Sequence, residues 1–537
     1  MPGLIALSAM LMVSIVAFAC GGDDESTPSA SETASPSTPS DQTPTMPQIS
    51  PSEDVLDLAI EPPLTTIWGS DTGDYLNDLP LLTSGDVNGD GKDDLLIGAR
   101  FGDGPENSRQ DSGEAYLLYG SDPLPTTIDL ANGEADVTIF AAEPNDQIGY
   151  AGALADVNDD GLTDIIIGAP FASGGVGAVY VFFGGPSLPS VIDLAVTEAD
   201  VTLKGAARNS FFGDAIASTD ANGDGIADII VGATFARRPA DMVNPNAQAG
   251  AAYVFFGDSS LAAERDTADG DFDVVIYGEN SDPHPDELGD NVFGADLNND
   301  GIGDIILTAE AADGPNNERS VAAEVHIVFG AEELGGVIDI ADGEQDVIVI
   351  GADPNDTLGF ALSAGDVNND GIADLLASAR GADGPGNSLA EPGEVHIVLG
   401  GALPETVDLL DNESTAYLYG SSAADMLGYA IAVFDLESDV QNEVLIGTGF
   451  ADSPGGRREA GAVYIFDASG LSGAHQIDLA PRLLTILGAQ SDDQLGAAAT
   501  SGDLDGDGLP EIIALAIRGD GPDDTRPDAG EIYVISP

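Results

Sequence analysis

The chain has 537 residues, of which 43% are hydrophobic, and its 68 glycines and 32 prolines are typical of a large protein of short strands and turns. Lys and Arg number 15 against 94 Asp and Glu, which gives a formal net charge of -79 at pH 7. Phosphate backbones and anionic lipid surfaces repel such a chain, so nucleic acid is excluded as a partner, and an acidic, lysine-poor surface suits a salty medium.

The N-terminus is predicted to be a targeting signal. Residues 4–18 form an apolar run of signal-peptide length, and small residues precede Cys20, the only cysteine in the chain. This arrangement resembles a bacterial lipobox, so residues 1–20 are expected to be a lipoprotein signal peptide with Cys20 as the lipidated residue. An ordinary secretion signal is the alternative, because residues 1–6 lack Lys and Arg. The expected location is outside the cytoplasm, at the cell surface, with a lipid anchor as the only contact with a bacterial membrane.

Residues 21–52 are rich in Ser, Thr, Pro and Asp and have few large apolar side chains. Such a segment cannot offset the entropy lost on ordering, so a disordered tether is predicted. With one cysteine the chain forms no intrachain disulfide.

Residues 53–537 are predicted to form a seven-bladed β-propeller. Four strand-like segments recur in each repeat, and in the second repeat they are 137–141, 148–155, 165–169 and 178–183. The chain enters through an unpaired segment, 64–70, and ends on another, 531–536. Pairing of these two segments would complete the last blade and close the ring, which leaves no open sheet edge.

A nine-residue acidic pattern, DxNxDGxxD, lies between the second and third segments of each repeat, about seventy residues apart. Regular copies occupy 86–94, 156–164, 220–228, 296–304 and 366–374. A sixth copy at 503–511 ends in glutamate, and a seventh at 435–443 is degraded.

The oxygen-rich loops are predicted to bind about five to seven structural Ca²⁺ ions, because alternate residues of a tight loop can direct oxygens at one centre. In the second repeat the ligands would be Asp156, Asn158, Asp160, the carbonyl of Leu162, and Asp164. The same roles fall to Asp86, Asn88, Asp90, Lys92 and Asp94; Asp220, Asn222, Asp224, Ile226 and Asp228; Asp296, Asn298, Asp300, Ile302 and Asp304; Asp366, Asn368, Asp370, Ile372 and Asp374; and Asp503, Asp505, Asp507, Leu509 and Glu511.

Two questions about these loops stay open. Empty Asx-rich turns would have the same composition, although an empty loop would hold three carboxylates together at a repulsive cost. In the degraded loop Val440 replaces the turn glycine. Whether Asp435, Glu437 and Asp439 bind metal is therefore left open by the sequence.

The repeats resemble the FG-GAP repeats of the seven-bladed propeller of integrin alpha subunits. The resemblance covers residues 55–537 and is carried by the acidic loops, by the triplet Gly168, Ala169, Pro170, and by hydrophobic-Gly pairs. These pairs are Ile148-Gly149, Phe212-Gly213, Leu288-Gly289, Leu358-Gly359, Leu427-Gly428 and Leu495-Gly496. The first repeat lacks such a pair, so the resemblance implies the fold more firmly than a ligand.

A second phrase recurs in the loops that follow the calcium-loop strand, which would lie on the opposite face of the ring. It reads Asp-Gly-Pro at 103–105, 313–315, 383–385 and 520–522, and each copy is followed by a glutamate, at Glu114, Glu324, Glu394 and Glu531. A repeated turn or part of a ligand surface would explain it. Arg518, Gly519 and Asp520 spell an RGD tripeptide, but the aligned loops contain Arg, Gly and Asp at the same turn, so a structural role is expected.

Little in the sequence points to catalysis. His326 and His396 occupy a strand position that is tyrosine in other repeats, and neither His284 nor His475 has a recognisable nucleophile partner. The chain is therefore expected to be a monomer without enzymatic activity that binds a protein or glycan, as an adhesion protein would. The alternatives are a structural cell-envelope protein without a specific ligand and a polysaccharide hydrolase or lyase.

Overall fold

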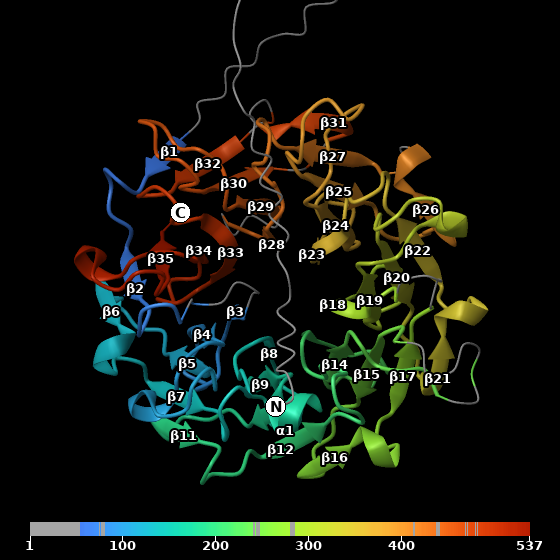
Figure 1. Cartoon of the computed structure of the whole chain (residues 1–537), viewed down its shortest axis with the longest axis horizontal. Coiled ribbons are helices and arrows are strands. Elements are labelled where there is room, and N and C mark those ends of the chain that lie inside the picture. Colours follow the sequence, from blue (N-terminus) through green and yellow to red (C-terminus); the bar gives the residue numbers. More distant parts are fainter. Residues whose placement is uncertain are drawn as a thin grey trace, which may run out of the picture. The chain divides into compact units, whose positions relative to one another are not determined.

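Seven sheets of five strands each follow one another along the chain, one for each acidic repeat, and they are arranged as blades around a central axis (Figure 1). The computed structural model describes residues 54–536 except 75, 77–80, 240–241, 243–247, 280–284, 412–413, 437–440, 468, 470, 478–479 and 481. Within the described residues the only α-helical segment is α1 (Ala172–Gly175), and it has four residues. The predicted all-β, seven-bladed propeller is confirmed.

The strands of the first four blades succeed one another from the axis of the ring outward. Blade 1 contains β3 (Leu82–Gly85), β4 (Asp94–Ala99), β5 (Glu114–Leu118), β7 (Val137–Phe140) and β11 (Val191–Asp193). Blade 2 contains β8 (Gly152–Ala155), β9 (Asp164–Ala169), β10 (Ala178–Phe182), β12 (Val201–Lys204) and β16 (Glu264–Asp266). Blade 3 contains β13 (Ile216–Thr219), β14 (Asp228–Ala233), β15 (Ala251–Phe255), β17 (Val274–Tyr277) and β21 (Gly336–Asp339). Blade 4 contains β18 (Leu288–Ala295), β19 (Asp304–Ala309), β20 (Glu324–Val328), β22 (Val347–Ile350) and β26 (Thr406–Asp408).

The last three blades follow the same order. Blade 5 contains β23 (Leu358–Gly365), β24 (Asp374–Ala379), β25 (Glu394–Val398), β27 (Ala416–Tyr419) and β31 (Gly473–Gln476). Blade 6 contains β28 (Ala430–Phe434), β29 (Glu443–Thr448), β30 (Ala462–Asp467), β32 (Arg482–Leu487) and β1 (Asp54–Asp57). Blade 7 contains β33 (Leu495–Gly502), β34 (Glu511–Ala516), β35 (Glu531–Ile535), β2 (Thr65–Trp68) and β6 (Thr127–Asp129). The first four strands of a blade are called A to D below, and loops are named by the strands they join.

The N-terminal strands close the ring. Strand β2 pairs antiparallel with β35, with Thr66 opposite Tyr533, so the predicted completion of the last blade is confirmed. Strand β1 pairs in parallel with β32 of blade 6, which ties the N-terminal segment to a second blade. The innermost strands of neighbouring blades contact one another all the way round, including β3 with β33 across the closure.

The fifth strand of each blade was not predicted. It is three or four residues long, runs parallel to strand D, and in blades 1 to 5 lies in the C–D connection of the following repeat, as β11 does when it pairs with β7. For blade 6 the strand is β1, and for blade 7 it is β6 of the first repeat. Each repeat therefore covers the outer edge of the blade before it.

The B strands are buried along their whole length because each lies between two neighbouring blades. Their aliphatic side chains, such as Leu95, Leu96 and Ile97 in β4, fill seven hydrophobic clusters, one at each junction between blades. The A strands, where the blades converge, include more small residues, such as Gly152, Ala153 and Ala155 in β8.

The hydrophobic-Gly pairs join adjacent blades. Within blade 2, Gly149 has φ +83°, and its N–H donates to the carbonyl of Gly168, the first residue of the triplet on β9. Across the junction between blades 1 and 2, a Cβ on Gly98 would lie 2.2 Å from the carbonyl oxygen of Gly149. At the next junction, a Cβ on Gly168 would lie 2.1 Å from the carbonyl oxygen of Gly213. Only glycine allows the two backbones to approach this closely, which explains both motifs with one contact.

Three repeats depart from the triplet glycine, and the structure accounts for the departures. Thr308 replaces it in β19 and donates its hydroxyl to the carbonyl of Gly359 at 3.1 Å, while Ser378 in β24 accepts the N–H of Ala361 at 2.8 Å. Leu515 replaces it in β34, which faces the first repeat, and that repeat lacks the hydrophobic-Gly pair. The sequence thus loses both partners of the contact at the same junction.

Arginines of the B–C loops clamp the fifth strands. In blade 4, Arg319 donates to both carboxylate oxygens of Asp408, at 2.7 and 2.5 Å, and to the carbonyl of Gly351 at 2.8 Å. The equivalent pairs are Arg109 with Asp193, Arg238 with Asp339, Arg457 with Asp57, and Arg526 with Asp129. In blade 5, Leu389 and Gln476 stand where the arginine and the aspartate would be. These pairs use five of the 15 cationic residues of the chain, and the paired arginine lowers the pKa of Asp57, Asp193 and Asp408.

Candidate metal centres

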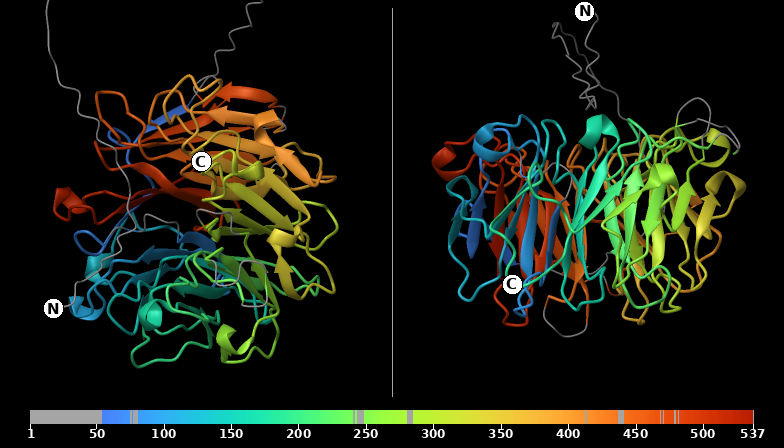
Figure 2. Two further views of the ribbon diagram at one scale, coloured as in Figure 1. Left: turned by 45° about the vertical axis from the view of Figure 1, so that its right-hand side comes forward. Right: turned by 90° about the horizontal axis from the view of Figure 1, so that it is seen from below.

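The acidic loops join strands A and B and therefore lie together on one face of the propeller, opposite the B–C loops (Figures 1 and 2). Each begins directly after an A strand, as at Asp86 after β3, and ends on the first residue of a B strand, as at Asp94 in β4. The fold thus brings all five regular copies and the sixth into the same setting.

The first aspartate organises the loop. Asp86 accepts the N–H of Gly89 and Asp90 on one carboxylate oxygen, at 2.7 and 3.0 Å, and that of Gly91 on the other, at 2.9 Å. Asp90 in turn accepts the N–H of Lys92 at 3.1 Å. Because a carboxylate has several lone pairs, these bonds leave oxygens that can coordinate a cation.

The ninth residue of the pattern is buried. Asp164 accepts the N–H of Val157 at 3.0 Å and of Gly184 at 2.9 Å, and the Asn158 amide at 3.2 Å. Burial raises the pKa of Asp94, Asp164 and Asp304 to about 6, and that of Asp228 and Glu511 to about 7. A cation beside these groups would stabilise their charged form.

The amide oxygen of Asn158 provides a test of whether a metal fits. Its Nδ2 is held by Asp164, so Oδ1 is directed to the opposite side, where it is buried and has no hydrogen-bond partner among the described residues. A buried oxygen without a donor is costly, and a hard cation is one way to satisfy it. The donor set is oxygen only, which fits calcium and not zinc or copper.

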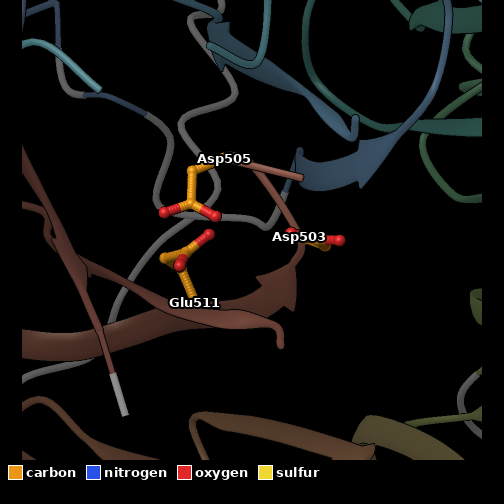
Figure 3. A group of neighbouring side chains, drawn as sticks. All are labelled: Asp503, Asp505 and Glu511. Atoms are coloured by element: carbon orange, nitrogen blue, oxygen red, sulfur yellow. The ribbon is translucent and has the colours of Figure 1, made fainter. Parts of the chain in front are cut away.

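In the sixth copy, one carboxylate oxygen each of Asp503, Asp505 and Glu511 lies within 4.8 Å of the other two. Figure 3 shows the carboxylates of Asp505 and Glu511 directed toward each other, with Asp503 at the side. Asp503 is held by the N–H of Gly506 and Gly508, at 2.8 and 3.0 Å. This loop differs from the five regular copies in having aspartate at position three and glutamate at position nine, and among the described residues it is the loop whose three carboxylates lie this close together.

The loops are joined to one another around the face. The carbonyl of Asp220, the first residue of the third loop, accepts the N–H of Gly303 in the fourth loop at 2.8 Å, and the carbonyl of Asp503 accepts that of Asp93 at 2.9 Å. The side chain at the seventh position of a loop packs on the loop before it. Leu162 lies so close to Gly89 of the first loop that a Cβ there would be 2.6 Å from it, and Ile302 lies 3.0 Å from a Cβ on Gly223 of the third loop. The other residues predicted as metal ligands lie in the same loops.

Several predicted sites fall outside the described residues. Cys20 and the tether, residues 21–52, belong to this part of the chain, as do Glu437, Asp439 and Val440 of the degraded loop and His284. Within the described part of that loop, Glu443 accepts the N–H of Leu436 at 2.7 Å, which is the ninth-position contact of the other loops. No helix among the described residues is both long and apolar enough to span a membrane.

On the opposite face, the Asp-Gly-Pro phrase forms a turn. Asp103 accepts the N–H of Asp111 at 2.9 Å, and Asp313, Asp383 and Asp520 make the same contact with Val321, Glu391 and Asp528. The returning glutamate is bound within the loop as well, since Glu114 accepts the Gly104 N–H and the Tyr116 hydroxyl.

The RGD tripeptide is part of this turn. Arg518 pairs with Asp528 at 2.9 Å, Asp520 accepts the N–H of the same residue, and a Cβ on Gly519 would lie 2.5 Å from the Glu531 side chain. The tripeptide is therefore held by contacts within its own loop.

The two strand histidines are buried, as predicted. His326 lies 3.3 Å from Glu324, and His396 lies 3.0 Å from Glu394 and stacks on Tyr417. These pairs correspond to the glutamate-tyrosine pair of β5. His475 is bonded to the carbonyl of Ser472 at 3.0 Å.

Comparison with known proteins supports the repeat assignment. The FG-GAP repeat model matches residues 81–118, 148–182, 212–255 and 358–398. The chain is 34% identical over 161 residues to phosphatidylinositol-glycan-specific phospholipase D of Mus musculus, covering 29% of this chain and 18% of that protein. It is 33% identical over 193 residues to integrin alpha-PS2 of Drosophila melanogaster, covering 33% and 13%.

A third relative, the phosphatidylinositol-glycan-specific phospholipase D of Dictyostelium discoideum, is 24% identical over 395 residues, covering 70% of this chain and 39% of that protein. The chain spans less than half the length of each of these relatives. The predicted FG-GAP repeats and the similarity to integrin alpha subunits are confirmed.

Proposed function

We propose that this FG-GAP repeat propeller is a calcium-stabilised binding protein, displayed outside the cytoplasm on a lipid anchor, that takes a protein or glycan ligand through its B–C and D–A loops. The observation that carries the proposal is the separation of the two faces. The acidic loops occupy one face of a rigid ring, and the longer B–C loops project from the other (Figure 2). Loops on a rigid scaffold are where binding commonly evolves.

Calcium would act as a staple in this protein. The buried ninth residue, the unpartnered oxygen of Asn158 and the clustered carboxylates of Asp503, Asp505 and Glu511 support a structural ion in each complete loop. Bound ions would neutralise carboxylates that otherwise repel one another. Display on the cell surface rests on the lipobox-like segment that ends at Cys20.

The calcium role is tested by calorimetric melting of the full chain in excess calcium and in chelator, with the bound metal counted by elemental analysis. We expect a large rise in melting temperature with calcium and about five to seven ions per chain. An unchanged melting temperature together with no bound metal would refute the structural role.

The ligand face is tested with two charge-matched variants. One carries Glu106→Arg, Glu318→Arg and Asp523→Arg in exposed positions of the B–C loops, and the other carries Asp122→Arg, Glu332→Arg and Glu405→Arg in exposed positions of the C–D connections on the calcium face. Binding to arrays of glycans and of extracellular proteins should weaken only in the first variant. Equal effects of both variants, or of neither, would remove the B–C face as the ligand surface.

An enzymatic role is the second candidate, because two of the relatives are named as phospholipases. Turnover of a polysaccharide or a phosphatidylinositol glycan by the purified chain would favour it. A structural envelope protein would instead show neither turnover nor binding in either test.

A further inference from the structure

A cleft of about 660 Å³ opens on the ligand face of blade 6. It lies between the D–A loop, residues 421–426, and the B–C loop, which contributes Phe450, Asp452 and Glu459 among others. The side chains of Tyr464, Arg482 and Thr485 line it from the sheet, and Val55 of the closing strand β1 lines it too. Its volume is within the range of about 300–1,000 Å³ that is typical of small-molecule sites.

At one level of its sheet, next to the cleft, blade 6 has an alanine opposite a leucine. The first residue of strand C and its partner on strand D are Glu114 and Phe140 in blade 1, Ala178 and Lys204 in blade 2, Ala251 and Tyr277 in blade 3, Glu324 and Ile350 in blade 4, Glu394 and Tyr419 in blade 5, Ala462 and Leu487 in blade 6, and Glu531 and Trp68 in blade 7. Every other blade has at least one long polar or aromatic side chain at this level. Residues two apart on a strand share a face, so the side chain missing at Ala462 would lie beside Tyr464 in the cleft.

The lining of the cleft is mixed in charge. Three carboxylates, Asp425, Asp452 and Glu459, and two guanidinium groups, Arg458 and Arg482, line the cleft, and Arg458 donates to Glu459 at 3.0 Å. Arg482 lies over the ring of Tyr464, 5.4 Å from its centre. Apolar side chains line the rest of the cleft, among them Val55, Met426, Phe450, Pro454 and Leu487.

This balance selects among ligand classes. The three carboxylates, in a strongly acidic protein, would repel an anionic ligand, and the two arginines would repel a cationic ligand. A hydroxyl group both donates and accepts, so a ligand rich in hydroxyls can pair with the carboxylates and the guanidinium groups together. The apolar face of a sugar ring can pack on the aromatic side chains of Phe450 and Tyr464, which line the cleft.

We infer that the blade 6 cleft binds a short neutral oligosaccharide. This inference rests on the proposed function, since it assigns the glycan site to one place on the B–C and D–A face. The closing strand β1 takes part in the site through Val55, so the cleft is complete only in the closed ring.

The chain itself suggests the test, which is to give blade 6 the residue of blades 1, 4, 5 and 7. In the full chain with calcium, Ala462→Glu should place a carboxylate beside the Tyr464 hydroxyl, as Glu531 lies beside Tyr533 at 2.5 Å, and fill the cleft. Ala178→Glu in blade 2 is the matched control, because Lys204 stands opposite it and can pair with the new carboxylate. Arg458→Ala, at a side chain that is 70% exposed, is a second variant that leaves the core untouched.

The probes are neutral hexose and N-acetylhexosamine trisaccharides, with uronate trisaccharides and tetrapeptides as the other classes, measured by calorimetric titration. We expect a neutral trisaccharide to bind, Ala462→Glu and Arg458→Ala to weaken it at least about tenfold, and Ala178→Glu to change it less than about twofold. Selective binding of uronates or peptides would overturn the ligand class.

Neutral sugar binding that survives both blade 6 variants would overturn the site but leave the proposed function standing, because the charge-matched loop variants test that face independently. Absence of any binding by the wild-type chain to these probes would overturn the inference even if the loop-face test succeeds with another ligand.

Discussion

Two carboxylates of one acidic loop have different surroundings and therefore different roles. Asp160, the fifth residue, is exposed and accepts a single N–H, from Leu162 at 3.0 Å. Asp164, the ninth, is buried and accepts two N–H groups and an amide. The Asp160 carboxylate can therefore act only as a ligand to a cation. The Asp164 carboxylate also stabilises the loop when no cation is bound.

The substitutions Asp160→Asn and Asp164→Asn separate these roles. Asp160→Asn should bind one ion fewer and keep the wild-type melting temperature in chelator. Asp164→Asn should also lose stability in chelator, by about 1–3 kcal/mol. Its NH2 group replaces one of the two carboxylate oxygens, so a donor would face a group that the carboxylate accepted. Metal counting and chemical denaturation in chelator check both, and equal stability of the two variants there would contradict the assignment.

Glycine at the blade junctions is required by distance. Gly168→Ala should destabilise the chain by about 2 kcal/mol or more, because its Cβ would lie 2.1 Å from the carbonyl oxygen of Gly213. Gly185→Ala, with nothing within 4 Å of the added Cβ, is the control and should leave the unfolding midpoint unchanged. A tolerated Gly168→Ala would mean that the blades can move apart at no cost.

Buried carboxyls on the face of the B–C and D–A loops give the chain a pH response of its own. Burial raises the pKa of Asp356 to about 7, whereas in the unfolded chain this group ionises near pH 4. The folded state therefore holds a proton that unfolding releases, and stability falls as the pH rises from about 4 to 7. Asp356→Asn keeps an acceptor for the N–H of Asp353 and should remove part of this loss.

The free energy of unfolding of Asp356→Asn minus that of wild type should be about 1–4 kcal/mol larger at pH 8 than at pH 5. Denaturation at the two pH values in constant calcium measures the difference. Asp408→Asn is the opposite case, because Arg319 lowers the pKa of Asp408, so the stability of that pair persists above about pH 4 and is lost as the pH falls further. A pH-independent difference for Asp356→Asn would contradict the buried protonated state.

The strands themselves were largely predictable, because seven repeats display the same alternation of aliphatic segments and turns, and the orphan first segment indicated the closure. The fifth strands were not, since three or four residues carry too little periodicity and these strands pair with the preceding repeat. The signal was the recurring Ile-Asp pair, as in Ile128-Asp129, Ile192-Asp193 and Ile338-Asp339, which a comparison of the repeats would have shown. The acidic loops could be located from spacing, but the blade 6 cleft depends on cross-strand neighbours that spacing does not provide.

Closure by two N-terminal strands predicts a graded response to truncation. Removal of residues 1–63 takes away β1 and the pair of Asp57 with Arg457, and should lower the melting temperature by several degrees. Removal of residues 1–69 also takes away β2, which leaves β35 and β6 without their partner and should open the ring. Melting and limited proteolysis of the two proteins in calcium compare them, and equal stability would contradict closure by β2.

The whole molecule has few cationic side chains to offset its net charge of -79, because five of its 15 Lys and Arg residues pair with aspartates of the fifth strands. Repulsion among the remaining carboxylates extends over roughly 8 Å at physiological ionic strength and shortens as salt rises. We therefore expect the chain in constant calcium to become more stable between about 0.1 and 1 M NaCl. Maximal stability at low salt would mean that the ion pairs outweigh the repulsion.

The pairing of β2 with β35 also orders events during biosynthesis. Strand β2 is synthesised early and can pair with β6 soon afterwards, but its antiparallel partner β35 is made more than 450 residues later. Contacts of such long sequence separation form slowly, and each blade can assemble before the ring is complete. A chain that lacks β35 would leave the facing edges of β2 and β34 without their partner, so closure of the ring depends on synthesis of the whole propeller.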